Sequence, residues 1–120
     1  QTPIFPLGGE SALDSGLQPR VPAIGLSLSQ LDQLIDYPAR DMTVTVGAGM
    51  KIEKLRQILA AEAQELPLDI PQSEHATIGG CIAANISGYR RLGNGTLRDY
   101  VIGIEAVDGH GTIYHGGGRV

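Results

Sequence analysis

The residues best suited to chemistry in this sequence are small ones, gathered in the stretch PQSEHATIGGCIAANISG between Pro71 and Gly88. The stretch holds three glycines among alanines and serines, and few large apolar side chains that could build a core. Each glycine in a helix costs about 1 kcal/mol relative to alanine, so the composition predicts a loop and not an ordinary helix. Small residues at this density indicate that the backbone approaches a ligand or another backbone closely. We interpret the stretch as a loop wrapped around a phosphate-bearing cofactor.

A second glycine turn occurs near the start of the chain, where Gly8-Gly9 follows an apolar segment at 4–6. When a strand leads into glycines and small polar residues, amide N–H groups can converge on an anion. A Gly-Gly pair alone is more often a simple turn, so this signal depends on the stretch at 71–88. We expect that no lysine or arginine lies beside either glycine loop. We therefore expect oriented N–H groups to hold the phosphate charge.

Several other chemistries are excluded. The glycines match neither the GxxxxGK[ST] nor the GxGxxG fingerprint, and His75, His110 and His115 lack metal-ligand spacing. A net charge of -4 without a basic cluster argues against nucleic-acid binding. No apolar run reaches the ~20 residues that span a bilayer. The single cysteine, Cys81, cannot form an intrachain disulfide, which favours a reducing, cytoplasmic location.

The elements that must position these glycines alternate between strand and helix. The expected strands are 4–6 (a short buried one), 21–28, 42–48, 101–107 and 112–115, the last two joined by a turn at 108–111. The expected helices are 29–36, 51–64 and a single turn at 96–100. In the segment 51–64, Ile52, Leu55 and Leu59 form one apolar stripe. Turn character marks 89–95 and 116–118, and Arg119-Val120 is strand-like.

Together these segments resemble a known family. The matching segments are PLGGESALDSG, a strand–helix unit ending in LPLDIP, and ATIGGCIAANISGYRRLGNGTLRDYVIGIEAVDGHGTI. They are similar to the FAD-binding (PCMH-type) domain of FAD-linked oxidases of the vanillyl-alcohol-oxidase type, above all to its glycolate oxidase and D-lactate dehydrogenase members. The specific part is TIGGxxAxNxSG at 77–88 followed by GTLRDYVIG at 95–103. The resemblance implies an α+β fold with a mixed β-sheet and a few helices, and FAD as the cofactor.

The resemblance also implies two loops whose backbone faces the diphosphate of FAD. The implied cofactor contacts are Gly8, Gly9, Glu10, Ser11 and Ala12 in the first loop, Pro71, Ala76, Thr77, Gly79, Gly80, Asn85, Ser87 and Gly88 in the second, and Ile102, whose main chain matches the adenine contact. Two departures stand out. Glu10 and Ser11 replace the third glycine and threonine of many relatives, and the first loop lacks the histidine that binds flavin covalently in some of them. Whether Glu10 reaches a ribose hydroxyl or solvent stays open.

Other polar residues receive structural interpretations. We expect His75 to contact the cofactor or solvent without a covalent link to flavin, and Cys81 to be a small buried thiol. Arg90-Arg91 is interpreted as a solvated loop, and Arg98-Asp99 as a local ion pair. Asp69, in a turn, is expected to cap backbone.

The implied function is the oxidation of a 2-hydroxy acid such as glycolate or lactate by hydride transfer to FAD. No catalytic residue is assigned within this sequence, and no metal site is expected. Residues 1–120 are expected to be an incomplete FAD-binding domain, with strands upstream and a cap domain downstream that supplies the substrate site. Two alternatives remain: a flavin-holding or interaction subunit that works with other oxidase subunits, and a binding module that keeps the fold without flavin.

Overall fold

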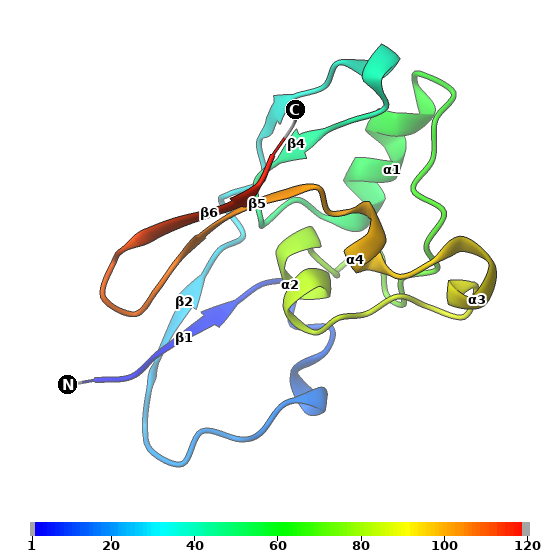
Figure 1. Cartoon of the computed structure of the whole chain (residues 1–120). Helices are drawn as coiled ribbons and strands as arrows, with labels where there is room; N and C mark the ends of the chain where they lie inside the picture. Colours follow the sequence, from blue (N-terminus) through cyan, green and yellow to red (C-terminus); the bar gives the residue numbers. More distant parts are fainter. Residues whose placement is uncertain (1, 119–120) are drawn as a thin grey trace.

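The computed structural model describes residues 2–118, so the strand-like pair Arg119-Val120 lies outside the described residues. The chain is made of short strands and short helices, with four helices in succession between β4 and β5 (Figure 1). The element order is β1 (Ile4–Leu7), η1 (Leu13–Ser15), β2 (Ile24–Ser27), β3 (Leu34–Asp36), η2 (Ala39–Asp41), β4 (Thr45–Val46), α1 (Ile52–Ala60), α2 (Ile78–Ala83), α3 (Arg91–Asn94), α4 (Leu97–Tyr100), β5 (Gly103–Val107) and β6 (Ile113–Gly117).

The strands form three separate two-stranded ladders and not one sheet. β1 and β2 are parallel, with Ile4 opposite Ile24. β3 pairs with β4, and β5 with β6, in antiparallel fashion. Figure 1 shows the helices gathered together, with the β1–β2 ladder and the β5–β6 hairpin extending away from them. The predicted α+β class with mixed strand directions and few helices is therefore confirmed.

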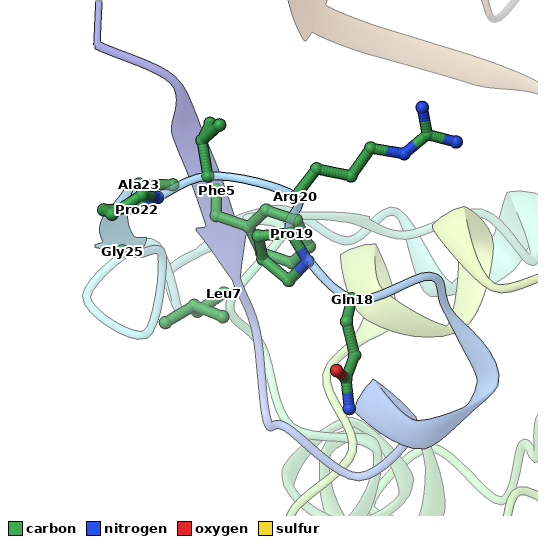
Figure 2. Close-up of a pocket in the computed structure, with 9 residues that line it drawn as sticks. Phe5, Leu7, Gln18, Pro19, Arg20, Pro22, Ala23 and Gly25 are labelled. Atoms are coloured by element: carbon green, nitrogen blue, oxygen red, sulfur yellow. The ribbon is translucent and has the colours of Figure 1, made fainter.

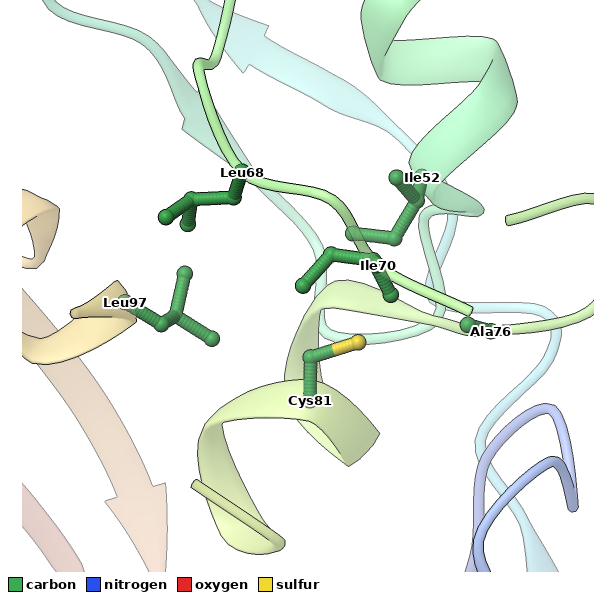
Figure 3. Packing of buried hydrophobic residues seen from close by; sticks show 6 residues of the cluster. All are labelled: Ile52, Leu68, Ile70, Ala76, Cys81 and Leu97. Atoms are coloured by element: carbon green, nitrogen blue, oxygen red, sulfur yellow. The ribbon is translucent and has the colours of Figure 1, made fainter. Parts of the chain in front are cut away.

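The core lies among the helices and the segment that joins α1 to α2. One cluster of buried side chains comprises Ile52, Leu68, Ile70, Ala76, Cys81 and Leu97 (Figure 3). A second contains Met50, Leu55 and Leu59. The predicted apolar stripe of α1 is thus buried, and each such side chain contributes about 1.5–3 kcal/mol by leaving water. The core therefore holds the first turn of α1 and the start of α2 in place.

The ladders lie outside this core. Every residue of β2, β5 and β6 is exposed, and so are the first three residues of β1. Large apolar side chains are among them: Ile4 is 60% exposed, Ile24 57% and Val107 63%. The segment at 4–6 is a strand as predicted, but the prediction that it is buried is wrong. Isolated two-stranded ladders are marginal in water, so these faces need a cover to be stable.

The predicted helix at 29–36 is wrong: this segment forms a turn followed by β3. Its backbone carbonyls bond across to the following glycine segment. Gly49 N–H donates to the Leu31 carbonyl at 2.8 Å, and Gly47 N–H donates to the Gln33 carbonyl at 2.9 Å. These long-range bonds use carbonyls that a helix would direct along its own axis.

The stretch at 71–88 is only partly a loop, because α2 forms inside it. Thr77 caps the start of the helix, its hydroxyl accepting from Gly80 N–H at 3.3 Å. Asn85, with a left-handed φ of 51°, ends it, and the amides of Asn85 and Ile86 bond back to carbonyls of the last turn. These two caps satisfy groups that a short helix would otherwise leave unpaired, and so outweigh the cost of its glycines.

The remaining elements agree with the predictions in type and differ in length. The helix predicted at 51–64 ends at Ala60, and the strand predicted at 42–48 shortens to β4. The turn at 96–100 is α4, which begins with a capping box between Thr96 and Asp99. The hairpin β5–β6 forms as predicted, but β6 continues through Gly116 and Gly117, where a turn was predicted, because these residues pair with Ile104 and Gly103. The exposed turn predicted at 89–95 contains the four-residue helix α3.

Candidate functional site

The two glycine segments lie in close contact, Gly9 against the His75 backbone and Gly8 against the Thr77 side chain. A Cβ atom placed on Gly8 would lie 2.4 Å from the Thr77 hydroxyl oxygen, and one on Gly9 would lie 1.7 Å from the carbonyl oxygen of His75. Both distances are shorter than any real contact, so only glycine permits this approach. The first loop and the start of α2, distant in the sequence, therefore form one continuous surface.

A cleft of about 320 Å³ opens at this junction. It is lined by both glycine segments, by the start of α1 and by the turn after β2. The lining residues are Gly8, Gly9, Glu10, Ser29, Asp32, Gly49, Lys51, Lys54, His75 and Thr77. Clefts that combine backbone groups with a few convergent charged side chains are typical of small-molecule sites.

Several amides at this cleft have no protein acceptor. Within residues 2–118, the N–H groups of Gly8, Gly9, Glu10 and Thr77 donate to no other group of the chain. Thr77 is only 3% exposed, and buried backbone donors are nearly always paired. Glu10 adopts a left-handed φ of 57°, a conformation found where successive amides turn toward an anion. The cleft is therefore rich in N–H groups able to hold a phosphate.

The glycines of α2 itself have a different task. Gly79 N–H donates to the Ala48 carbonyl at 2.8 Å, and a Cβ on Gly79 would lie 2.8 Å from the Cβ of Ala48. Ile78 N–H likewise donates to the Met50 carbonyl at 2.8 Å. Gly79 thus allows α2 to pack on the segment before α1. Gly80, whose surroundings are more open, stays at the edge of the junction.

The prediction that no lysine or arginine lies beside the glycine loops is wrong in space. Lys51 and Lys54 come from the start of α1 and line the cleft. An isolated antiparallel β-bridge between the backbones of Lys51 and Thr77 fixes this end of α1 against the start of α2. Lys54 Nζ lies 2.7 Å from Asp32 Oδ2, and this hydrogen bond lowers the pKa of Asp32 below its usual value. Sequence reasoning missed this side of the cleft, although two basic residues opening a helix after GAG were a usable signal.

Other predicted contacts lie away from the cleft lining and have roles in the fold. Ser87 Oγ accepts from Leu97 N–H at 3.1 Å, and Gly88 has a φ of 75° with its Cβ position 2.2 Å from the Asp69 carbonyl oxygen. Asn85 ends α2, as described above. The Ile102 carbonyl accepts from Gly118 N–H at 2.8 Å. Outside the lining also lie Ser11, Ala12, Pro71, Ala76, Gly79 and Gly80. As cofactor contacts, all of these stay predictions.

Cys81, Arg90 and Asp99 all lie outside the cleft lining. Cys81 is 1% exposed, as predicted for a small buried thiol, and burial raises the pKa of this thiol to about 11. Arg90 is not simply solvated: it binds both carboxylate oxygens of Asp69 at 2.7 Å. Hydrogen bonds from Thr96, more than the charge of Arg98, lower the pKa of Asp99. None of these groups lines the cleft.

A larger groove of about 570 Å³ lies beside β1 and β2 (Figure 2). Its walls are mainly apolar and include Phe5, Leu7 and the two prolines Pro19 and Pro22. Figure 2 shows its two long polar side chains, Gln18 and Arg20, extending in different directions. Without convergent polar groups, this groove lacks the means to orient a ligand.

In the part of the chain that is described, no group of three or more His, Cys, Asp or Glu side chains is placed to hold a metal ion. In the same residues, no helix is both long and apolar enough to cross a membrane.

Comparison with known proteins agrees with the geometry. The family described as FAD binding domain matches residues 1–117. The D-lactate dehydrogenase of Archaeoglobus fulgidus is 35% identical over 98% of this chain and 26% of its own length. Glycolate oxidase subunit GlcD of Bacillus subtilis is 34% identical (100% and 26%). The D-2-hydroxyglutarate dehydrogenase of Xanthomonas citri pv. viticola is 33% identical (92% and 23%).

Among solved structures, an alkyldihydroxyacetonephosphate synthase superposes with a TM-score of 0.79 at 21% identity, over 98% of this chain and 22% of that one. This likeness shows that the two share a fold. The chain spans about a quarter of the length of the relatives named above. With a family match over nearly its whole length and a cleft of unpaired amides between two glycine turns, the chain belongs to the FAD binding domain family.

Proposed function

We propose that this chain holds FAD for an enzyme that oxidises a 2-hydroxy acid, such as glycolate or lactate, by hydride transfer to FAD. The observation that carries the proposal is the close approach, at one cleft, of Gly9 to the His75 backbone and of Gly8 to the Thr77 side chain. FAD, when bound, supplies the hydride acceptor. The chain's own residues bind and orient its diphosphate through N–H groups that have no other acceptor in residues 2–118.

The cleft fits a diphosphate on two grounds. A Cβ on Gly9 would displace the His75 backbone, and one on Gly8 would displace the Thr77 side chain, so the tight junction depends on both glycines. Its free amides and lysines are the donors that a doubly charged phosphate group requires, whereas Glu10 and Asp32 are the acidic members of the lining. Within this lining we propose Gly8, Gly9, Glu10 and Thr77 as cofactor contacts. Ala76 and Gly80 adjoin them in sequence.

The substrate class rests on the relatives. Those named above are a D-lactate dehydrogenase, a D-2-hydroxyglutarate dehydrogenase and a glycolate oxidase subunit, and each of these acids carries a hydroxyl next to its carboxylate. In this proposal the lining of the cleft serves the cofactor, and no group of it is assigned to the 2-hydroxy acid. We infer that the groups that recognise the acid belong to a cap domain of a longer polypeptide.

The exposed strand ladders support the proposal that this chain is part of a longer polypeptide. Apolar side chains of β1, β2, β5 and β6 stand exposed, and a further part of the FAD-binding domain or the cap domain would cover them. The Bacillus relative is by its name a subunit, which favours a complex with other oxidase subunits as the alternative setting. A cytoplasmic location remains an expectation based on the single buried cysteine.

The test uses the complete polypeptide that carries this domain. After purification, its visible absorbance and the mass of the flavin released by denaturation identify the cofactor. Anaerobic addition of glycolate, lactate or 2-hydroxyglutarate should then bleach the flavin band. A protein that is colourless and takes up no FAD refutes the proposal. A protein that binds FAD but is bleached by none of these acids supports the flavin-holding subunit instead.

A further inference from the structure

The positive charge of this cleft has an unusual source. The whole sequence contains two lysines, Lys51 and Lys54, and both line the cleft. None of the arginines that the structure describes lies in its lining. The only two primary-amine side chains of the chain therefore meet the two glycine turns at one place.

Helix capping and the helix dipole give no reason for lysines at these positions. Lys51 is the N-cap residue of α1, and Lys54 lies in its first turn. The amide end of a helix carries partial positive charge, so acidic residues are favoured there and cations are disfavoured. Lys51 also offers no side-chain oxygen to cap the helix. Residues that break a local rule in this way are expected where function requires them.

The structure holds both lysines toward the cleft. The bridge between Lys51 and Thr77 fixes the Lys51 backbone beside a buried amide that has no acceptor in residues 2–118. Lys54 Nζ contacts Asp32 twice, at 2.7 Å to Oδ2 and 3.2 Å to the carbonyl oxygen. Both side chains of this pair are about half exposed, at 49% and 48%, so an anion that enters the cleft can exchange with the carboxylate.

We propose that Lys51 and Lys54 are the cationic contacts for the FAD diphosphate in this chain. The glycine-turn amides fix its orientation, and the two ammonium groups neutralise its charge. On binding, Lys54 exchanges Asp32 for a phosphate oxygen. This inference rests on the proposed function, since it concerns the same cleft and adds the side chains that give it charge.

The test measures the dissociation constant of FAD for the complete polypeptide, stripped of flavin, at low and high salt. The variants are Lys51→Gln and Lys54→Gln, each paired with the arginine replacement that keeps the charge. Each glutamine variant should weaken FAD binding about tenfold at low salt, the factor expected for one charge-assisted hydrogen bond. High salt should narrow the difference, because the lost contact is partly exposed. Arg40→Gln is the matched control: it removes one exposed positive charge outside the cleft lining.

Each outcome bears on one claim. If the glutamine variants bind FAD like Arg40→Gln while the unmodified protein binds it tightly, the lysine inference is wrong and the proposed function stands. If arginine at these positions binds as weakly as glutamine, charge is not the cause and the inference is also wrong. If the unmodified protein binds no FAD, the proposed function itself fails.

Discussion

Gly9 is the position where a single methyl group should separate the two loops. An alanine Cβ there would lie 1.7 Å from the His75 carbonyl oxygen, whereas ordinary contact begins near 3.4 Å, so the two backbones must move apart by about 1.7 Å. Overpacking of this kind usually costs about 1–3 kcal/mol. The obstacle is a backbone carbonyl, which cannot rotate away as a flexible side chain does. We therefore expect Gly9→Ala to destabilise the fold by an amount within this range.

The same displacement should weaken cofactor binding. Binding of FAD would have to bring the separated loops back together against the added methyl group. If this costs about 1.4 kcal/mol, the dissociation constant of FAD rises about tenfold. Denaturant unfolding followed by circular dichroism gives the stability, and titration of flavin-free protein gives the affinity. Gly93→Ala is the control, because nothing lies within 4 Å of that Cβ position and alanine favours the helix α3. Equal stability and equal FAD affinity in the two variants would refute the contact between the loops.

Three further predictions concern the supports of the cleft. Thr77→Ala removes the hydroxyl that caps α2 and should lower the free energy of unfolding by about 1 kcal/mol, measured by denaturant titration, whereas Thr77→Ser should not. Hydrogen bonds from Arg90 lower the pKa of Asp69 below its usual 3.8. The pair therefore stabilises the fold above pH 3.8, and this stabilisation is lost as the pH falls through the lowered pKa. In Arg90→Ala, the free energy of unfolding measured against pH should lack this loss at acidic pH. Burial raises the pKa of the Cys81 thiol to about 11, so an alkylating reagent at neutral pH should modify it only as fast as the protein unfolds, and rapid labelling of the folded protein would contradict this.

The sequence was most informative where one local signal and the core agree. The stripe Ile52, Leu55 and Leu59 predicts α1, and all three side chains are buried in the structure. The turn at 96–100 carries its own capping box, so it needs no distant partner to form. In both elements, the residues that define the helix lie within a few positions of one another, which is the range over which periodicity and capping act.

The predictions are wrong where hydrogen bonds to backbone distant in the sequence determine the local structure. At 29–36 the spacing of three apolar residues fits a helix, yet Gly47 and Gly49 use the carbonyls of that segment. Close backbone contacts of this kind depend on the whole chain and leave no periodic signal. The helix α2 was missed for the opposite reason: glycine content argued against it, while Thr77 and Asn85 terminate it at both ends.

The candidate site likewise contains residues that the sequence predicts and residues that it does not. Gly8, Gly9 and Thr77 could be picked out by composition and by the family resemblance, and the structure brings them together. The lysines were not picked out, because their place at the cleft follows from the β-bridge between Lys51 and Thr77. A sequence shows which residues are small, but only the folded chain shows which charged residues face them.

The gathering of both lysines at one cleft also makes this part of the molecule chemically addressable. An acylating reagent that attacks ε-amino groups has only Lys51 and Lys54 as side-chain targets in these 120 residues. Among peptides from these 120 residues, mapping after brief acylation would therefore report on the cleft alone. The rate at each lysine becomes a local reading of whether the cleft is open or occupied, obtained without any change to the sequence.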